Sequence, residues 1–315
     1  MGEDLLFTTR SYARLGNDVA AQGAFETGQS SLQIFPDGEL YQRVVTPVHG
    51  RDVALIAGTG TDADTLEAFD LAFALIEQGA RSLTLAIPFF GYATMERAWR
   101  NGDAVKAVSR ARLWSSLPVA PMGNRILILE PHTPGLPFYF GRNAVVSAIS
   151  GIPLMLKMLE RFPKEESVLC SPDVGRIKWV DELALLLGWP SAFVVKRRNE
   201  EGAVEAMGLI GSVRGKRVVL CDDMIRTGKT LLRAAEACLQ AGAASLAAIA
   251  IHGAFTKEAI SELDASGLFA TIGCTDSHPN SFRMETDRLH VESSAELLAE
   301  ALGHSLEPML RPGPA

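Results

Sequence analysis

The sequence predicts an α/β fold with two domains. Short aliphatic runs alternate with longer amphipathic stretches along the chain, a pattern typical of repeated strand–helix units and parallel sheets. The 315 residues favour two domains, because one domain commonly takes about 150 residues. The stretch SAISGIPL combines small residues with Gly and Pro. We therefore expect a boundary near residue 150 and domains at 1–150 and 151–315.

Each half of the chain repeats the same alternation of strands and helices. In the first half we expect strands at 52–58, 82–90 and 124–132 and helices at 64–80 and 102–117. In the second half we expect strands at 166–173, 191–198, 216–223, 244–253 and 269–277 and helices at 175–187 and 229–242. Two similar halves do not define a function, which has to be inferred from the sites.

The composition excludes several classes of protein. Apolar residues make up 47% and charged residues 21%, as in ordinary globular proteins. The net charge of −7 disfavours nucleic-acid binding, which requires clustered cations. No apolar run approaches the about 18 residues of a membrane span, and MGEDLLFTTR does not resemble a signal peptide. We expect a soluble cytoplasmic protein that binds neither nucleic acid nor membranes, with its four cysteines as buried free thiols.

The segment VVLCDDMIRTGKTLL, residues 218–232, contains the Gly-Lys-Thr end of a nucleotide-binding P-loop. The full motif is G-x-x-x-x-G-K-[ST], and its backbone N–H groups cradle phosphate. Counting back from Gly228, Asp223 occupies the position of the first Gly. A carboxylate there would repel the phosphates, so the segment is not a P-loop.

A ribose phosphate fits the same segment better. Thr227, Gly228 and Thr230 lie where a helix is expected to begin, and the N–H groups of a helix N-terminus favour a phosphate. Asp222 and Asp223, at the end of the preceding strand, can accept hydrogen bonds from vicinal hydroxyls. A phosphate beside a diol describes ribose 5-phosphate. The alternative is that the two aspartates only cap a helix.

This segment resembles the ribose-5-phosphate-binding loop shared by type I phosphoribosyltransferases and ribose-phosphate diphosphokinases, the enzymes that make phosphoribosyl diphosphate. The resemblance implies two tandem type I phosphoribosyltransferase-like domains, each a mostly parallel sheet flanked by helices. It places the ATP side in the first domain and the ribose 5-phosphate side in the second. The residues that it assigns to ribose 5-phosphate are Asp222, Asp223, Arg226, Thr227, Gly228, Lys229 and Thr230.

Two stretches of the first half favour the diphosphokinases over the phosphoribosyltransferases. SLQIFPDGELYQRV resembles their F-P-D-G-E segment. There Phe35 would face the adenine ring, and Asp37 and Glu39 would bond the ring or fix the loop, although P-D-G alone is also a good turn. PFFGYATMER follows a predicted strand, and its Glu96 and Arg97 are candidates for ATP contacts. A lone Arg is more often a solvated surface residue.

Three further stretches carry residues that the resemblance assigns to metal binding and catalysis. In EPHTPGLPFYFG, His132 corresponds to a His that helps to hold magnesium ATP, and in SPDVG, Asp173 corresponds to an Asp near the second magnesium. In KRRNEEG, Lys196 and Arg198 correspond to cations that extend over the reacting phosphates. The alternatives are a structural His and a solvated charge run. Mg²⁺ is the implied cofactor.

Details of the resemblance favour the class II branch known from plants. The sequence has a T-x-E-R stretch followed by G-D-x-x-x-A, and later F-Y-F-G and T-D-S-x-P. That branch typically needs no inorganic phosphate and accepts several nucleoside triphosphates as donors. Two positions depart from the family pattern, because Lys229 replaces the usual Gly and His278 replaces a small residue or Cys.

The implied reaction moves the β,γ-diphosphoryl group of magnesium ATP to the 1-hydroxyl of ribose 5-phosphate and releases AMP. The family's members are homo-oligomers, and we expect an oligomer here. Three alternatives stay open. They are the same chemistry on another sugar-phosphate acceptor, signalled by Arg226 and Lys229, a phosphoribosyltransferase, and a catalytically silent regulatory homologue.

Overall fold

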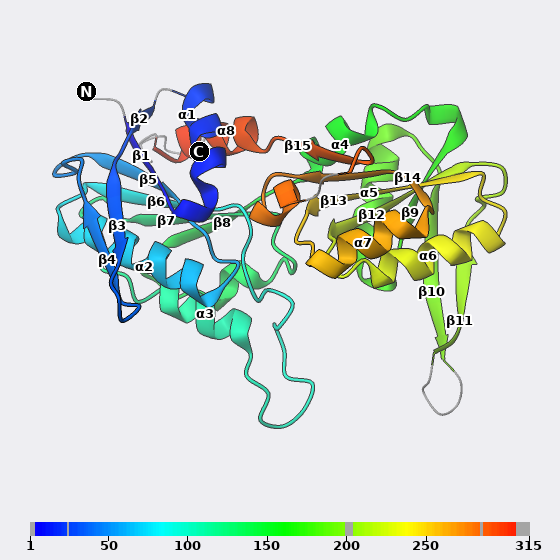
Figure 1. Ribbon diagram of the computed structural model, residues 1–315, viewed down its shortest axis with the longest axis horizontal. Helices are drawn as coiled ribbons and strands as arrows, with labels where there is room; N and C mark the ends of the chain where they lie inside the picture. Colours follow the sequence, from blue (N-terminus) through cyan, green and yellow to red (C-terminus); the bar gives the residue numbers. More distant parts are fainter. Residues whose placement is uncertain (1–3, 24, 199–203, 284–285, 307–315) are drawn as a thin grey trace, which may run out of the picture. The chain divides into compact units, whose positions relative to one another are not determined.

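The computed structural model describes residues 4–23, 25–198, 204–283 and 286–306. The chain forms two compact units (Figure 1). Unit 1 consists of Met1–Ser150 together with Ser294–Ala315, and unit 2 of Gly151–Ser293. The predicted α/β class is confirmed, because each unit contains a mainly parallel sheet flanked by helices.

The sheet of unit 1 is parallel, with strand order β2-β1-β5-β6-β7-β8. A separate antiparallel hairpin precedes β5. The sheet strands are β1 (Asp4–Thr8), β2 (Phe25–Thr27), β5 (Asp52–Ile56), β6 (Ser82–Ile87), β7 (Asn124–Leu129) and β8 (Val145–Ile149), and the hairpin strands are β3 (Ser30–Ile34) and β4 (Leu40–Val44). The helices are α1 (Ala13–Gln22), α2 (Asp62–Glu77), α3 (Lys106–Trp114) and α8 (Ala295–Leu306).

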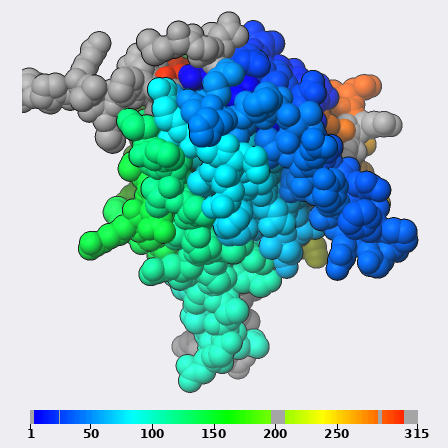
Figure 2. All heavy atoms as spheres, turned by 90° about the vertical axis from the view of Figure 1, so that its left-hand side faces the viewer, coloured from blue at the N-terminus to red at the C-terminus, as the bar shows by residue number. Residues whose placement is uncertain are grey.

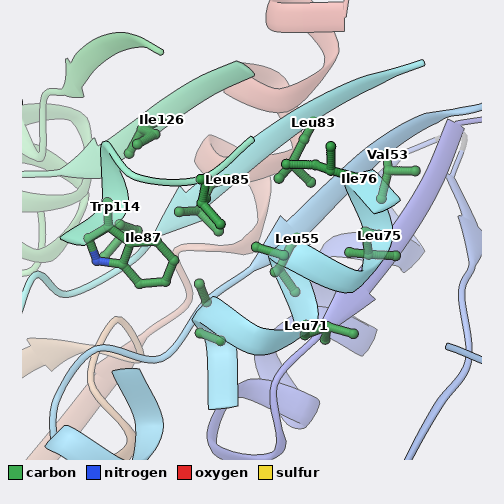
Figure 3. Packing of buried hydrophobic residues seen from close by; sticks show 14 of the residues in the cluster. Val53, Leu55, Leu71, Leu75, Ile76, Leu83, Leu85, Ile87, Trp114 and Ile126 are labelled. Atoms are coloured by element: carbon green, nitrogen blue, oxygen red, sulfur yellow. The ribbon is translucent and has the colours of Figure 1, made fainter. Parts of the chain in front are cut away.

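Helices cover both faces of this sheet because its strands are apolar on both faces. Successive strand residues point to opposite sides. On one face Val53 and Leu55 pack with α2 and α3, and Figure 3 shows these strand side chains against Leu71 and Leu75. On the other face the strands pack with α1 and α8. The sheet is thus the middle of three layers.

Unit 2 repeats this arrangement with strand order β11-β10-β9-β12-β13-β14-β15. All neighbours are parallel except β10 and β11. Its strands are β9 (Ser167–Ser171), β10 (Ser191–Arg198), β11 (Val204–Ile210), β12 (Arg217–Met224), β13 (Ser245–His252), β14 (Phe269–Thr275) and β15 (Leu289–Glu292). Its helices are α4 (Ile152–Leu159), α5 (Ile177–Leu187), α6 (Lys229–Gln240) and α7 (Lys257–Ser266).

The two units have equivalent topologies. The order β2-β1-β5-β6-β7-β8 in unit 1 matches β10-β9-β12-β13-β14-β15 in unit 2, strand for strand along the chain. The helix α2 after β5 therefore corresponds to α6 after β12. The two similar halves expected from the sequence are present, and equivalent loops can be compared directly.

Most predicted elements lie within a few residues of the observed ones. The helix expected at 102–117 is shorter, because α3 spans Lys106–Trp114. Its expected first turn is a loop, in which Gly102 has φ +89° and the Asp103 carboxylate accepts hydrogen bonds from the N–H groups of Trp99 and Arg100. The four cysteines are buried free thiols, as expected. No helix among the described residues is long and apolar enough to cross a membrane.

The C-terminal helix differs from the expected division of the chain. The division at residues 150 and 151 coincides with the predicted boundary, but α8 packs on unit 1 and not on the second domain predicted at 151–315. Leu298 and Leu302 of α8 lie in one buried cluster with Leu15 and Val19 of α1. Without α8, that face of the sheet in unit 1 would be exposed to water.

Substitution of Leu298 tests how much α8 contributes to unit 1. Leu298 is fully buried, so Leu298→Ala should lower the free energy of unfolding by about 2–5 kcal/mol. Leu185→Ala on α5 is the control, because that side chain is 82% exposed and its loss should cost less than about 0.5 kcal/mol. Urea unfolding of both variants measures the difference, and equal costs would contradict the packing of α8.

Candidate active site

The candidate site lies at the carboxyl end of β12, where the sheet of unit 2 meets the N-terminus of α6. Ligands of parallel α/β sheets commonly bind at this edge. Residues 218–221 of β12 are buried and apolar, and Asp222 and Asp223 follow directly. The strand thus carries two carboxylates to the edge.

The two aspartates differ in their surroundings. The side chain of Asp223 is only 2% exposed, and both of its carboxylate oxygens accept hydrogen bonds from Arg176. The side chain of Asp222 is 15% exposed, and its Oδ1 accepts a hydrogen bond of 2.9 Å from the N–H of Asp223. Arg176 Nε lies 4.0 Å from Asp222 Oδ1. One guanidinium therefore faces both acids.

Burial raises the pKa of Asp222 well above its usual value. The negative charge of Asp223 and, more weakly, that of Asp173 raise it further. A carboxyl group in this position binds a proton more tightly than one in water, and it gains from any ligand that donates hydrogen bonds to it. A sugar diol is such a ligand.

The N-terminus of α6 is open. Its N-cap residue, Gly228, has φ +71° and supplies no side-chain hydrogen bond, and the first turn contains no acidic residue. A Cβ at Gly228 would lie 2.9 Å from Leu263 Cγ, so glycine is required for space as well as for its backbone conformation. Lys229 is the first helical residue, where a cation is unfavourable unless an anion is near.

The equivalent helix of unit 1 has a closed N-terminus. The Thr61 side chain caps α2 by accepting a hydrogen bond from the N–H of Asp64, and its hydroxyl donates to the Asp64 carboxylate at 2.6 Å. Asp62 and Asp64 add negative charge to the first turn. The two equivalent helices thus differ at their N-termini. Of the two, α6 has uncapped N–H groups and no acidic residue in its first turn, and these features suit a phosphate.

The sequence-predicted residues Phe35, Asp37 and Glu39 form the turn of the β3–β4 hairpin. The Phe35 N–H donates to the Glu39 carbonyl at 2.8 Å, and the Asp37 carboxylate accepts from the Glu39 N–H at 3.1 Å. This hydrogen bond joins the Asp37 side chain to the backbone of the turn. Phe35 is partly exposed beside Tyr41, with ring centroids 6.1 Å apart.

The loop that carries Glu96 and Arg97 projects from unit 1 between β6 and α3, and it lies at the bottom of Figure 2. The Arg97 guanidinium lies over the ring of Trp99, with its carbon 4.3 Å from the ring centre. Trp99 is 76% exposed. Sequence reasoning missed this aromatic residue, although a Trp inside a polar loop is a usable signal for ligand contact.

Tyr92, which follows β6, is held in a left-handed conformation with φ +62°. Its hydroxyl donates to Asp62 at 2.6 Å, and Arg110 donates to the same carboxylate oxygen at 2.5 Å. Glu130, after β7, also has a positive φ of +36°. Backbone strain at strand ends is typical of functional loops, and the loop after Glu130 contains His132, which is half-buried.

Asp173 follows β9 and caps a short 3-10 helix, Val174–Arg176, by accepting a hydrogen bond of 2.8 Å from the Gly175 N–H. It lies near enough to Asp222 to raise the pKa of that group. The described residues contain no group of three or more metal-binding side chains. A magnesium ion that keeps water and substrate oxygens needs only one or two carboxylates, so Asp173 fits that kind of binding.

Lys196 and Arg198 lie at the end of β10, paired with Met207 and Val204 of β11. Their side chains, and the rest of the predicted loop at 199–203, lie outside what the structure describes. Arg226, Thr227 and Lys229 are exposed at the β12–α6 loop.

Sequence reasoning missed Arg176, the cation that contacts the acid pair. The stretch SPDVG indicates Asp173 alone, although Arg176 is the next residue. Arg176 lies beyond the end of β9 at Ser171, and β9 neighbours the acid-bearing strand β12 only in the folded sheet, so the local sequence carries no signal for this ion pair.

Two models of known protein families match this chain. Residues 148–272 match the phosphoribosyl transferase domain. Residues 5–117 match the N-terminal domain of ribose phosphate pyrophosphokinase. The chain is therefore an α/β enzyme that combines an N-terminal domain of the ribose phosphate pyrophosphokinase kind with a phosphoribosyl transferase domain.

Full-length relatives then identify the family. A ribose-phosphate pyrophosphokinase of Caldanaerobacter subterraneus is 31% identical over 300 residues, which cover 94% of this chain and 93% of the relative. The chloroplastic ribose-phosphate pyrophosphokinase 1 of Oryza sativa is 31% identical over 94% of this chain and 74% of its own. The crystal structure of phosphoribosylpyrophosphate synthetase from Mycobacterium smegmatis has a TM-score of 0.87 at 26% identity, covering 97% of this chain and 99% of that one. The chain belongs to the ribose-phosphate pyrophosphokinase family.

The raised pKa of Asp222 predicts that Asp222→Asn stabilises the protein. The folded chain keeps the Asp222 proton to a higher pH than the unfolded chain does, so ionisation above about pH 4 lowers the free energy of unfolding. The variant avoids this loss and keeps an oxygen for the Asp223 N–H. We expect its Tm to exceed that of the wild type by roughly 2–4 °C near pH 8, with the difference shrinking as the pH falls toward 4.

The exposed Glu182 on α5 provides the control. Glu182→Gln should leave Tm unchanged at every pH, because that carboxyl is solvated in both states. A lower Tm for Asp222→Asn at neutral pH would show that the ionised Asp222 stabilises the fold.

Proposed function

We propose that this chain transfers the β,γ-diphosphoryl group of magnesium ATP to the 1-hydroxyl of ribose 5-phosphate, giving 5-phosphoribosyl 1-diphosphate and AMP. The observation that carries this proposal is the acid pair at the end of β12 followed by the open N-terminus of α6, in a chain of the ribose-phosphate pyrophosphokinase family.

Unit 2 supplies the sugar side of the reaction in this proposal. The acids Asp222 and Asp223 serve the ribose hydroxyls. The loop residues Arg226, Thr227, Gly228, Lys229 and Thr230 bind the 5-phosphate. Uncapped N–H groups and the Lys229 charge at α6 suit a dianionic phosphate, because the helix N-terminus carries a partial positive charge.

Unit 1 supplies the nucleotide side. Phe35 offers an exposed ring for the adenine, while Asp37 and Glu39 shape the hairpin turn that presents it. Glu96 and Arg97 contact ATP from the projecting loop, and the stacking of Arg97 on Trp99 limits the motion of its side chain. His132 also belongs to the ATP side.

The proposed cofactor is Mg²⁺, for which Asp173 in unit 2 and His132 in unit 1 would each be a candidate ligand, alongside water and phosphate oxygens. Magnesium neutralises phosphate charge and orients the triphosphate when it is bound. Of the two residues, Asp173 has the oxygen donor that Mg²⁺ prefers. Its carboxylate is already oriented by the Gly175 N–H.

The chemical step needs positioning more than covalent catalysis. The anomeric oxygen of ribose 5-phosphate forms a bond to the β-phosphorus. The bond between that phosphorus and the oxygen bridging to the α-phosphate breaks, AMP leaves with the electron pair, and the proton of the 1-hydroxyl is released to water. Lys196 and Arg198 are assigned to the charge that develops around the β-phosphorus and the leaving oxygen, an electrostatic contribution that is often large.

We further propose that the chain belongs to the class II branch, uses ATP or other nucleoside triphosphates without inorganic phosphate, and acts as a cytoplasmic homo-oligomer. Support for the branch comes from the stretches T-x-E-R and T-D-S-x-P, and one relative is a plant enzyme.

Release of AMP tests the function directly. Incubation of the purified chain with ATP, magnesium and ribose 5-phosphate should produce AMP and 5-phosphoribosyl 1-diphosphate in equal amounts, with no need for inorganic phosphate. AMP formation only in the presence of phosphate would contradict the class II assignment and keep the reaction. Absence of AMP under both conditions would contradict the proposed reaction and favour another acceptor or a silent homologue.

Replacement of Lys196 tests the assignment of the catalytic cations. Lys196→Ala should lower kcat by about 10²–10³-fold, the cost of removing one electrostatic stabiliser of a transition state, while the Kd for ribose 5-phosphate changes little. Lys178→Ala is the control, because Lys178 is an exposed cation on α5 of the same unit. Turnover near that of the wild type in Lys196→Ala would remove Lys196 from the mechanism.

A further inference from the structure

Arg176 occupies a central place in unit 2 that the proposed mechanism does not use. It ends the short 3-10 helix after β9, and its side chain is 12% exposed. β9 and β12 are neighbouring parallel strands, so residues that follow their carboxyl ends lie at the same edge of the sheet. Arg176 reaches from the end of one strand to the acids at the end of the other.

Arg176 contacts the two acids unequally, since it pairs with both oxygens of Asp223 but lies farther from Asp222. Its Nε donates to Asp223 Oδ1 at 3.0 Å, and a terminal nitrogen donates to Asp223 Oδ2 at 2.5 Å. This two-point geometry is the strong form of an arginine–carboxylate pair. Because Asp223 is also 2% exposed, its carboxylate is directed into the protein. Asp222 is the more accessible acid.

Asp223 in turn orients Asp222. The N–H of Asp223 donates to Asp222 Oδ1 at 2.9 Å, which restricts rotation of the Asp222 carboxylate. A chain of contacts therefore runs from the Arg176 guanidinium to the Asp223 carboxylate, through the backbone of Asp223, to the Asp222 carboxylate. The Arg176 Nε–Asp223 Oδ1 and Asp223 N–Asp222 Oδ1 distances, 3.0 and 2.9 Å, are those of ordinary hydrogen bonds.

Charge gives a second reason for this arrangement. Two adjacent carboxylates at a buried strand end repel each other, and one nearby cation compensates for that repulsion. Without Arg176, the Asp223 carboxylate would have to become hydrated or protonated, and its side chain would move. The backbone that follows, including the start of the phosphate loop, would then no longer be held in position.

We infer that Arg176 is the positioning residue of the ribose 5-phosphate site, that Asp223 anchors the loop through it, and that Asp222 is the more accessible of the two acids for the sugar diol. The inference rests on the proposed function for the identity of the sugar phosphate. It assigns Arg176 a role in substrate affinity and no contact with ATP or with the reacting atoms.

Steady-state kinetics of the full-length chain test this assignment by separating the two substrates. Arg176→Met should raise the KM for ribose 5-phosphate at least tenfold and change the KM for ATP less than twofold. Arg176→Lys should give an intermediate value, because an ammonium keeps the charge but cannot hold both carboxylate oxygens in a fork. If Arg176→Met does not fold, the KM for ribose 5-phosphate of Arg176→Lys still tests the assignment.

A double-mutant cycle shows whether Arg176 affects the KM for ribose 5-phosphate through Asp223 or independently of it. If Arg176 acts through Asp223, then Arg176→Met combined with Asp223→Asn should raise the KM for ribose 5-phosphate no more than twofold beyond Arg176→Met alone. Arg288→Met is the matched control, because Arg288 forms an exposed ion pair with Asp264 in the same unit. Its kinetic constants should equal those of the wild type.

Three outcomes would overturn the inference. They are an unchanged KM for ribose 5-phosphate in Arg176→Met, an equal rise of both KM values, and independent effects of the two substitutions. Calorimetric binding of ribose 5-phosphate separates this result from the proposed reaction. If the wild type makes no AMP yet binds ribose 5-phosphate, a Kd at least tenfold weaker in Arg176→Met, with an intermediate Kd in Arg176→Lys, still supports the inference, and no binding by the wild type overturns it.

Discussion

Compensation of negative charge at the end of β12 is the constraint on which the site depends. Two carboxylates stand side by side where a buried strand ends, and one of them is almost fully enclosed. Such a pair is stable only with a cation close by, and Arg176 provides it from the neighbouring strand. The loop that follows the acid pair leads to Gly228, whose left-handed conformation starts α6. The ion pair thus joins the residues after β9 to the strand that leads into this loop.

The two units show how a common fold acquires different chemistry. Their sheets have equivalent strand orders, so the fold alone does not say which unit binds the phosphorylated sugar. The difference lies in a few residues at one turn. The first turn of α2 is capped by Thr61 and carries the negative charges of Asp62 and Asp64. The first turn of α6 has no side-chain cap at Gly228 and begins with Lys229, so its N–H groups suit an anionic ligand. Local hydrogen bonding thus gives two equivalent helices first turns of opposite character.

The sequence could predict those features that depend on residues close together in the chain. The strand, acid pair, glycine and helix start of residues 218–232 form one continuous stretch, and the P-D-G turn of the hairpin closes at Gly38 with φ +93°. Arg176 and Asp223 are 47 residues apart, and α8 meets α1 from the other end of the chain. No local pattern reports such contacts, which exist only once the strands have been ordered into a sheet.

The route of the chain has a consequence for how the protein is made. Because unit 1 is interrupted by the whole of unit 2 and resumes only at Ser294, a ribosome releases most of unit 1 before unit 2 and its covering helix after unit 2. Domains generally fold as units while synthesis proceeds. Unit 2 can complete its core on the nascent chain, whereas the apolar strand face that α8 covers stays open until the residues from Ser294 onward have been synthesised. The first domain to begin is therefore closed only after the whole of the second has been made.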